Sequence, residues 1–139
     1  MKILVVCTGN SCRSQMAEGF LKSYGGNLEV HSAGTQPAPA VNPYAIKVMG
    51  EVGIDISHNR THHVDEFLNE EWDYVITVCG GARETCPSFT GKVKNRLHIG
   101  FDDPAEAKGS DEEVLSLFRR VRDEIGEEFL KFHHNLLKP

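Results

Sequence analysis

The sequence predicts an α/β fold in three layers, with helices on both faces of a four-stranded parallel sheet. Short apolar runs alternate along the chain with segments of helical periodicity, which is the pattern typical of such a sheet. The length of 139 residues, with 40% hydrophobic and 25% charged side chains, suits one domain with one core. We therefore expect residues 1–139 to fold as a single domain.

Two strands and two helices are expected in the first half of the chain. Residues 2–6 form an apolar first strand, and Arg13 begins a helix whose apolar residues share one face. A short second strand follows over residues 28–32. Asn42-Pro43 is a capping residue followed by a proline suited to the first helical turn, so a second helix begins there and ends at Gly53.

The second half of the chain adds a short helix over residues 65–69, two strands and a long helix. The third strand covers residues 74–78 and the fourth covers residues 96–99. A final helix follows Ser110, its capping residue, and reaches about His134. Apolar residues of that helix recur at spacings of three and four and are expected in the core: Val114, Phe118, Val121, Ile125, Phe129 and Phe132.

The segment Cys-Thr-Gly-Asn-Ser-Cys-Arg-Ser, residues 7–14, follows the first strand directly and predicts a loop that binds an oxyanion. The N–H groups of such a loop converge at a helix N-terminus, where the helix dipole favours negative charge. Arg13 adds a planar fork that suits a tetrahedral anion. The residues expected to bind the anion are Thr8, Gly9, Asn10, Ser11, Cys12, Arg13 and Ser14.

Cys7 is expected to be a nucleophile, because the same positive field lowers the pKa of its thiol. Ser14 is expected to donate its hydroxyl to the sulfur and stabilise the thiolate further. A buried cysteine that only fills space at the end of a strand is the alternative interpretation. The strand before Cys7 and the helix after the loop favour the nucleophile.

An acid that protonates a departing oxygen is expected in the loop after the fourth strand. Ligands of open parallel sheets bind beyond the carboxyl ends of the strands, so this loop and Cys7 can meet at one rim. Asp102 and Asp103 are both candidates, and Asp103 precedes a proline.

Cys79 and Cys86 separate this chain from a simple anion-binding protein. Cys79 follows a buried strand, and Cys86 lies in a polar, glycine-containing stretch. Zinc is disfavoured because no matching Cys/His pairs accompany them, which leaves a dithiol pair or two core cysteines. If the stretch between them were helical, their Cα atoms would lie about 10 Å apart, too far for a disulfide. We therefore expect this segment to rearrange when the two cysteines pair.

Composition argues against several classes of partner. The formal net charge of −5 disfavours nucleic acid. No apolar stretch approaches the roughly 20 residues that span a bilayer, and the apolar run before Cys7 is too short for a signal peptide. We expect no nucleic-acid or membrane partner and a cytoplasmic location.

The motif Cys-Thr-Gly-Asn-Ser-Cys-Arg-Ser-Gln-Met-Ala-Glu-Gly at residues 7–19 resembles the thioredoxin-coupled arsenate reductases, which share the low-molecular-weight tyrosine phosphatase fold. The motif alone indicates only the phosphatase superfamily, and the added presence of Cys79 and Cys86 makes the resemblance specific. The similarity covers nearly the whole chain and continues through Ser32-Ala33-Gly34, Asn42-Pro43, residues 52–57, Val78-Cys79-Gly80, Cys86-Pro87, residues 100–105 and residues 119–125.

The resemblance implies reduction of arsenate to arsenite, as in arsenic detoxification, by a relay of three cysteines. Cys7 attacks arsenate held by Arg13 and the loop, and Asp103 protonates the departing oxygen. Cys79 then attacks Cys7 and releases arsenite. Cys86 attacks Cys79, and thioredoxin reduces the resulting disulfide. Phosphate and sulfate are expected as analogues of arsenate, and no tightly bound cofactor is implied.

Some members of the family bind a monovalent cation, potassium, beside the loop. Asn10, Glu18 and Ser32 match those ligand positions, whereas His62 stands near the place of an expected carboxylate.

Two other functions fit the residues. A low-molecular-weight tyrosine phosphatase would use the same nucleophile, arginine and acid, but it would present tyrosines just after the Asp-Pro, where this chain has Ala105-Glu106-Ala107. A weak phosphatase side activity is expected in any case, because phosphate and arsenate are alike in shape and charge. A non-catalytic oxyanion-binding or redox-sensing module would use Cys79 and Cys86 only to report oxidation.

Overall fold

The computed structural model describes residues 1–81, 86 and 88–136, and four strands within them form one sheet. The strands are β1 (Lys2–Cys7), β2 (Glu29–Gly34), β3 (Trp72–Thr77) and β4 (Val93–His98). All neighbours run parallel, in the order β2-β1-β3-β4. The predicted four-stranded parallel sheet is confirmed.

The helices begin close to the predicted positions. They are α1 (Arg13–Ser23), α2 (Pro43–Glu51) and α4 (Asp111–Leu136), with the 3-10 helices η1 (Val64–Phe67) and η2 (Pro104–Glu106). The side chain of Asn42 accepts a hydrogen bond from the Tyr44 N–H at 2.8 Å, and Ser110 Oγ accepts one from the Glu113 N–H at 3.2 Å. Both caps therefore act as the sequence predicts.

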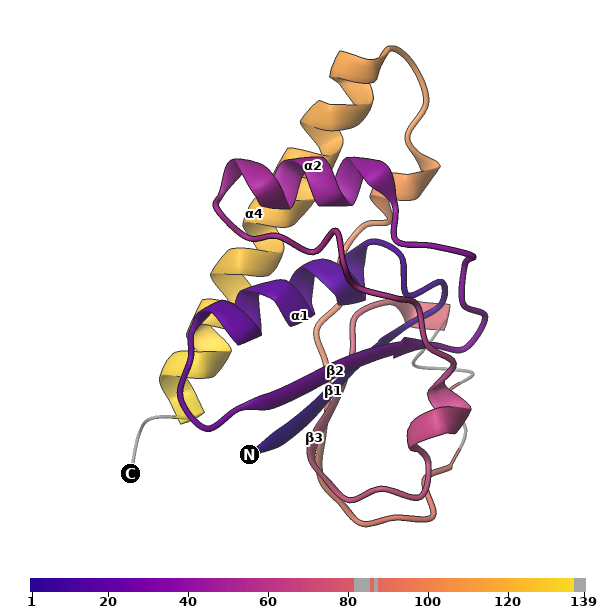
Figure 1. Ribbon diagram of the computed structural model, residues 1–139, viewed down its shortest axis with the longest axis vertical. Coiled ribbons are helices and arrows are strands. Elements are labelled where there is room, and N and C mark those ends of the chain that lie inside the picture. Colours follow the sequence, from indigo (N-terminus) through magenta and orange to yellow (C-terminus); the bar gives the residue numbers. More distant parts are fainter. Residues whose placement is uncertain (82–85, 87, 137–139) are drawn as a thin grey trace.

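The sheet is covered on two faces. Tyr74 of β3 packs against Phe132 of α4, with ring centres 5.0 Å apart, whereas His31 of β2 packs against Phe67 of η1 at 5.5 Å. Tyr74 pairs with Ile3 and His31 pairs with Leu4, and adjacent residues of a strand face opposite sides. The helices α1, α2 and α4 stack on one side (Figure 1), with η1 on the other, which gives the three layers expected.

The core follows the predicted pattern, because every residue of the apolar stripe in α4 is buried. The edge strand β4 departs from the prediction by starting three residues earlier, at Val93 rather than Arg96. Its sequence mixes charged and apolar residues, and most of its side chains are exposed. This segment is a strand because it pairs with β3. Its sequence has no apolar periodicity from which the start of the strand could be predicted.

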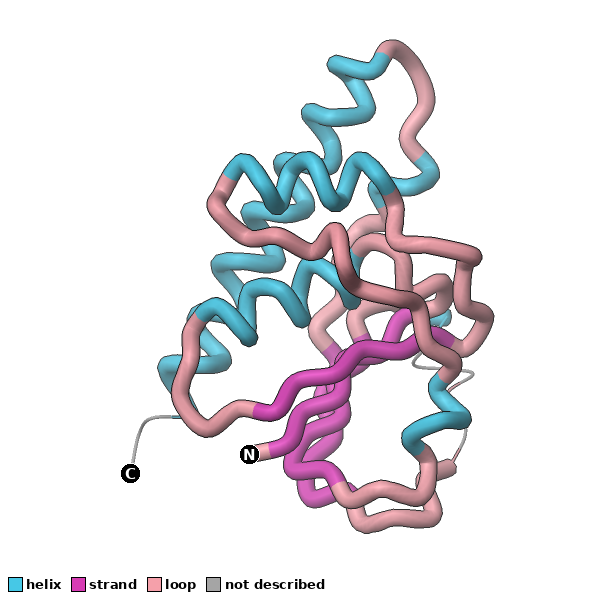
Figure 2. Tube along the Cα trace, in the orientation of Figure 1, coloured by secondary structure: helices cyan, strands magenta, loops and turns pink. Residues whose placement is uncertain are grey.

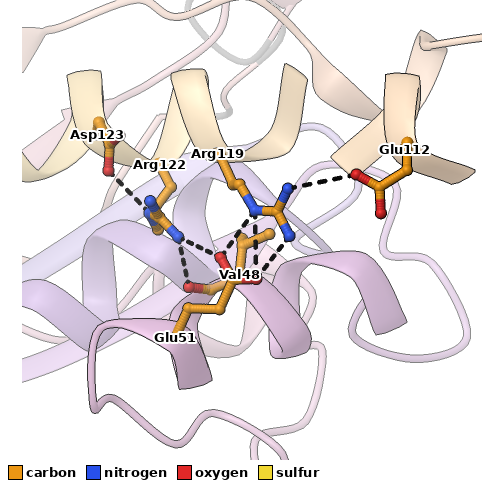
Figure 3. Close-up of polar contacts among 6 residues, drawn as sticks. All are labelled: Val48, Glu51, Glu112, Arg119, Arg122 and Asp123. Atoms are coloured by element: carbon orange, nitrogen blue, oxygen red, sulfur yellow. Dashed lines mark hydrogen bonds and ion pairs between the residues drawn. The ribbon is translucent and has the colours of Figure 1, made fainter. Parts of the chain in front are cut away.

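The contact between α2 and α4 depends on a buried arginine (Figure 3). Arg122 Nη1 donates to the Val48 carbonyl oxygen at 2.9 Å and to Glu51 Oε1 at 2.8 Å. Arg119 Nη2 donates to the other oxygen of Glu51 at 2.8 Å. These bonds lower the pKa of Glu51 to about 2, and the bond from Arg119 has the largest effect. They also satisfy a carbonyl at the end of α2 that the helix itself leaves without a partner.

The strand order places a topological switch point beside β1. The chain leaves β1 for β2 on one side and returns to β3 on the other, so a crevice opens between the carboxyl ends of β1 and β3. Cys7 ends β1, and Cys79 lies two residues after β3. The loops that follow the strands gather at this end of the sheet (Figure 2). Within the described residues, no helix combines the length and apolarity needed to cross a membrane.

Candidate active site

The loop between β1 and α1 turns around the sulfur of Cys7. Asn10 adopts a positive φ of 52°, a conformation that asparagine tolerates better than most residues. This turn directs the Asn10 backbone N–H to Cys7 Sγ at 3.1 Å. The loop is fixed to the sheet through the Gln36 N–H, which donates to the Thr8 carbonyl oxygen at 2.9 Å. The backbone that would bind an anion is therefore held by β2 and by the residues after it.

The side chain of Asn10 is the centre of the hydrogen bonds behind the loop. Its Nδ2 donates to Ser14 Oγ at 2.8 Å and to Ser32 Oγ at 2.9 Å, and its Oδ1 accepts from the His62 N–H at 2.9 Å. Ser14 Oγ lies 2.9 Å from Cys7 Sγ. Because Ser14 accepts from Asn10, its own hydrogen can be donated to the sulfur, which is the role predicted for Ser14.

The expectation of a lowered pKa at Cys7 is wrong for this structure. Cys7 is 2% exposed, and burial raises the pKa of its thiol because a thiolate there loses its hydration. The hydrogen bonds of Ser14 and Asn10 lower that pKa but do not outweigh burial, and the nearby Cys79 raises it further. The sequence indicated the groups that stabilise the thiolate but could not give the depth of burial that opposes them.

Arg13 and Asp103 lie side by side at the rim of the sheet. Arg13 Nη2 is 3.5 Å from Asp103 Oδ2, and Nη1 donates to the Phe101 carbonyl oxygen at 3.0 Å. Asp102 instead pairs with Arg120 of α4, with Nη2 and Oδ2 3.1 Å apart. Of the two candidate acids, Asp103 is therefore the one that the structure brings to the loop.

Cys79 lies against the same loop from the β3 side. Its thiol shares a hydrogen bond of 3.3 Å with Thr8 Oγ1, and its side chain is buried. Cys86 is half-buried. Residues 82–85 and 87 lie outside the described residues, so the predicted rearrangement between Cys79 and Cys86 falls largely outside them too.

Cys12 is a poor nucleophile in this arrangement. Burial raises the pKa of its thiol to about 12, and its Sγ lies 3.7 Å from Ser11 Oγ. This supports a structural role for its side chain.

The residues of the expected cation site meet, but an internal donor already engages one side-chain oxygen of each of them. Glu18 is 6% exposed, and its Oε2 accepts from Lys22 Nζ at 3.0 Å and from Asn59 Nδ2 at 3.1 Å. Asn10 directs an N–H group, not an oxygen, to Ser32. This arrangement does not fit a potassium ion, because the ammonium of Lys22 supplies the positive charge. Among the described residues, no group of three or more His, Cys, Asp or Glu side chains could hold a metal.

Sequence reasoning missed Gln15, which is fully buried beside the loop. Its Nε2 donates to the Asn10 carbonyl oxygen at 3.1 Å and to the Arg60 carbonyl oxygen at 3.0 Å, and its Oε1 accepts from Asn59 Nδ2 at 3.0 Å. It joins the loop to Asn59 and Arg60. The only signal in the sequence was a polar residue next to the inner apolar positions of α1.

A buried cysteine and an arginine at the two ends of one loop, on a parallel sheet with an aspartate beside the arginine, define a protein of the cysteine-dependent phosphatase type. The family model described as low molecular weight phosphotyrosine protein phosphatase matches residues 2–139. The chain belongs to this family.

Similar proteins carry the name arsenate reductase. One from Halalkalibacterium halodurans is 53% identical over 131 residues, which are 94% of this chain and 93% of that protein. One from Bacillus subtilis is 50% identical over the same shares. A solved structure described as an arsenate reductase in the phosphate binding state has a TM-score of 0.78 and 36% identity, and the match covers 94% of this chain and 95% of that one.

A phosphatase of the same fold is also similar. The solution structure of a low molecular weight protein tyrosine phosphatase from Bacillus subtilis has a TM-score of 0.78 and 27% identity, over 98% of this chain and 97% of that one.

Proposed function

We propose that this protein reduces arsenate to arsenite with Cys7, Cys79 and Cys86, and that thioredoxin restores the thiols. The observation that carries the proposal is the 3.3 Å hydrogen bond between Thr8 Oγ1 and Cys79 Sγ, because it keeps a second thiol beside the loop that holds the first. The relatives named arsenate reductase support arsenate as the oxyanion, and so arsenic detoxification as the role.

In the first step, the thiolate of Cys7 attacks arsenic, and one oxygen of arsenate departs as water. The loop N–H groups and Arg13 bind the remaining oxygens. Asp103 protonates the departing oxygen, and its 3.5 Å separation from Arg13 supports this role because the two groups would meet the same anion. Ser14 stabilises the Cys7 thiolate before the attack.

In the second step, the thiolate of Cys79 attacks the sulfur of Cys7. A Cys7–Cys79 disulfide forms, the sulfur–arsenic bond breaks, and its electron pair remains on arsenic. Arsenic is thereby reduced from the +5 to the +3 state and leaves as arsenite, while two thiols are oxidised. The location of Cys79 near Thr8 supports this attack, since thiol exchange depends on access as well as on pKa.

In the third step, Cys86 attacks Cys79 and returns Cys7 to its thiolate form. Cys7 is 2% exposed, whereas Cys86 is only half-buried, so the transfer moves the disulfide toward the surface. A protein reductant such as thioredoxin can reach a disulfide there. Because the cycle needs reduced thiols, we expect the protein to act in the cytoplasm.

The test is a coupled assay that follows NADPH oxidation with arsenate, thioredoxin and thioredoxin reductase. We expect turnover by the native chain and less than a single full cycle per molecule from Cys79→Ser or Cys86→Ser. Cys7→Ser should lose both arsenate reduction and hydrolysis of p-nitrophenyl phosphate. Repeated turnover by either of the first two variants would rule out the three-cysteine relay.

Weak hydrolysis of phosphate esters is a second candidate activity. It is favoured by the loop with its Arg13–Asp103 pair and by the similarity to a low molecular weight tyrosine phosphatase. Since Cys79 and Cys86 have no part in phosphate transfer, their serine variants should retain this activity. The same two variants thus separate the two reactions.

A further inference from the structure

A cavity of about 300 Å³ lies on the sheet face that carries η1, and its described lining includes no residue of the anion-binding loop. Val75, which lines it, is the register partner of Leu4, and Leu4 in turn pairs with His31, which packs against η1. The cavity is lined by Val75, Thr77, Cys86, Arg96, Leu97 and His98. Strands β3 and β4 therefore form a wall beside the thiol of Cys86.

Arg96 brings a positive charge to this cavity. It pairs with Val75 across the sheet, and its guanidinium carbon lies 5.5 Å from the centre of the Phe89 ring, a distance at which a cation and an aromatic face attract. No carboxylate of the described residues forms an ion pair with Arg96. By contrast, Lys94 of the same strand pairs with Asp73 at 3.2 Å. Arg96 is thus a positively charged group in the lining that this cavity shares with Cys86.

A positive charge near Cys86 favours the thiolate form of its side chain. Burial raises its pKa, because a thiolate in a half-buried site loses hydration, and the charge of Arg96 lowers it. His98 is the other titratable group in the lining, and its Nδ1 shares a hydrogen bond of 2.8 Å with Thr77 Oγ1. The attacking form of a cysteine is the thiolate, so the group that favours it controls the rate of attack.

We propose that Arg96 is a positioning residue that favours the thiolate of Cys86 for its attack on Cys79. The inference rests on the proposed relay and adds to it a residue for the third step. In that step the Cys79–Cys86 bond forms, the Cys7–Cys79 bond breaks, and the electron pair leaves on Cys7 as a thiolate. The proton that Cys86 gives up beforehand passes to water. The number of disulfides is unchanged, so no other reactant is needed.

The experiment measures the reactivity of Cys86 directly. Native protein, Arg96→Gln, Arg96→Lys and Lys94→Gln are alkylated with iodoacetamide between about pH 6 and about pH 9, where thiolate content controls the rate. Trypsin then releases residues 84–92 as a peptide in which Cys86 is the only cysteine, and mass spectrometry gives the labelled fraction. Lys94→Gln is the matched control, because it removes the same charge two residues away, outside this cavity.

We expect Arg96→Gln to slow Cys86 alkylation roughly two- to fivefold at neutral pH and to shift its pH profile upward, as removal of one partly exposed charge would. Arg96→Lys should restore most of the rate, and Lys94→Gln should leave it unchanged. In a single turnover with arsenate, Arg96→Gln should also accumulate the Cys7–Cys79 disulfide.

Equal profiles for the native protein and Arg96→Gln, or an equal loss in Lys94→Gln, would overturn the inference about Arg96. The proposed function is judged separately, because its failure would appear as the absence of any arsenate-driven disulfide in the native protein.

Discussion

Gly34, the last residue of β2, lies against the carbonyl oxygen of Thr8, and no space remains between them for a side chain. A Cβ at Gly34 would also come within 3.0 Å of the Asn10 backbone nitrogen. That nitrogen donates to Cys7 Sγ. The shape of the anion-binding loop therefore depends on the absence of a side chain at Gly34 in the neighbouring strand.

Gly34→Ala should distort this loop. The added methyl group meets backbone atoms, which cannot move aside as a flexible side chain can, so we expect a loss of about 1–3 kcal/mol in the free energy of unfolding. Phosphate binding should weaken at the same time. Urea denaturation and calorimetric titration with phosphate measure the two effects.

Gly50→Ala is the control for this substitution. Gly50 lies in the last turn of α2, where a Cβ would meet no atom within 4 Å. Because alanine favours a helix over glycine by roughly 1 kcal/mol, this variant should be as stable as the native chain or more stable. Equal losses in the two variants would contradict the specific role of Gly34.

Ser14→Ala should make the Cys7 thiolate harder to form. Ser14 is the hydroxyl donor beside the sulfur at 2.9 Å, and a hydrogen bond to a charged group contributes about 1.5–3 kcal/mol. The pKa of Cys7, already raised by burial, should rise further, because the hydrogen bond from Ser14 is one of the groups that lower it. Iodoacetamide labelling of Cys7 against pH measures this shift. Ser23→Ala, which removes an exposed hydroxyl at the end of α1, should leave the profile in place.

Asp103→Asn removes the acidic group but keeps the side-chain oxygen that begins η2. Asp103 Oδ1 accepts from the Ala105 N–H at 3.0 Å and begins η2, a bond that an asparagine oxygen can also accept. The variant should fold normally yet lose roughly 10²–10⁴-fold in the rate of the first step. Rapid-quench measurement of Cys7 modification by arsenate gives this rate. Asp102→Asn, which removes only the pairing with Arg120, should stay within a few-fold of the native rate, and a reversed order would assign the acid to Asp102.

Replacing sodium by potassium should not change turnover. The ammonium of Lys22 already lies 3.0 Å from Glu18 Oε2, so the buried carboxylate has its counter-charge. Coupled assays in matched sodium and potassium buffers test this expectation. A marked rise in potassium would mean that the ion displaces Lys22 and that the resemblance to cation-binding members extends to this site.

Arg122→Gln should destabilise the contact between α2 and α4 (Figure 3). It leaves the Val48 carbonyl without its donor, and we expect a loss of about 1–3 kcal/mol in the free energy of unfolding. Arg120→Gln, on the exposed face of the same helix, should change stability by no more than about 0.5 kcal/mol.

The carboxylate of Glu51, which pairs with Arg122, predicts that the fold loses stability in acid. The pKa of Glu51 is about 2 in the folded chain and about 4.3 in an unfolded one. A depressed pKa stabilises the fold above the unfolded value and ceases to do so as pH falls toward the folded value. Thermal unfolding from pH 6 down to pH 2 should therefore show a fall below about pH 4.3. Glu51→Gln should reduce that part of the fall.

The sequence predicted the fold because its signals are local. The apolar run of β1, the Asn42 and Ser110 caps and the stripe in α4 each follow from neighbouring residues, and all four appear in the structure. The start of β4 was misplaced because pairing with β3, and not its own composition, makes it a strand. Edge strands with exposed side chains carry little apolar signal.

The residues of the site could be predicted from the sequence, but the net effect of burial and hydrogen bonding on the pKa of Cys7 could not. Cys7, Ser14 and Asn10 lie within eight residues, so their meeting follows from one turn of chain. Burial raises the pKa of Cys7, and the residues that pair with or lie near it, Gly34 of β2 and Cys79 after β3, are remote in sequence. Lys22 pairs with Glu18 across one turn of α1 at 3.0 Å, a contact that follows from the four-residue spacing of the two charges.

The carboxamide of Asn10 has a chemical consequence for the lifetime of the protein. Its nitrogen donates to two hydroxyl groups, and one of these is the donor to Cys7. Hydrolysis of that amide, a gain of about one mass unit, would replace this donor with an anionic acceptor facing Ser14 and repel a bound oxyanion. Hydrolysis of this single amide would therefore stop the loop from binding an oxyanion. It would leave the hydrophobic core and the other thiols intact.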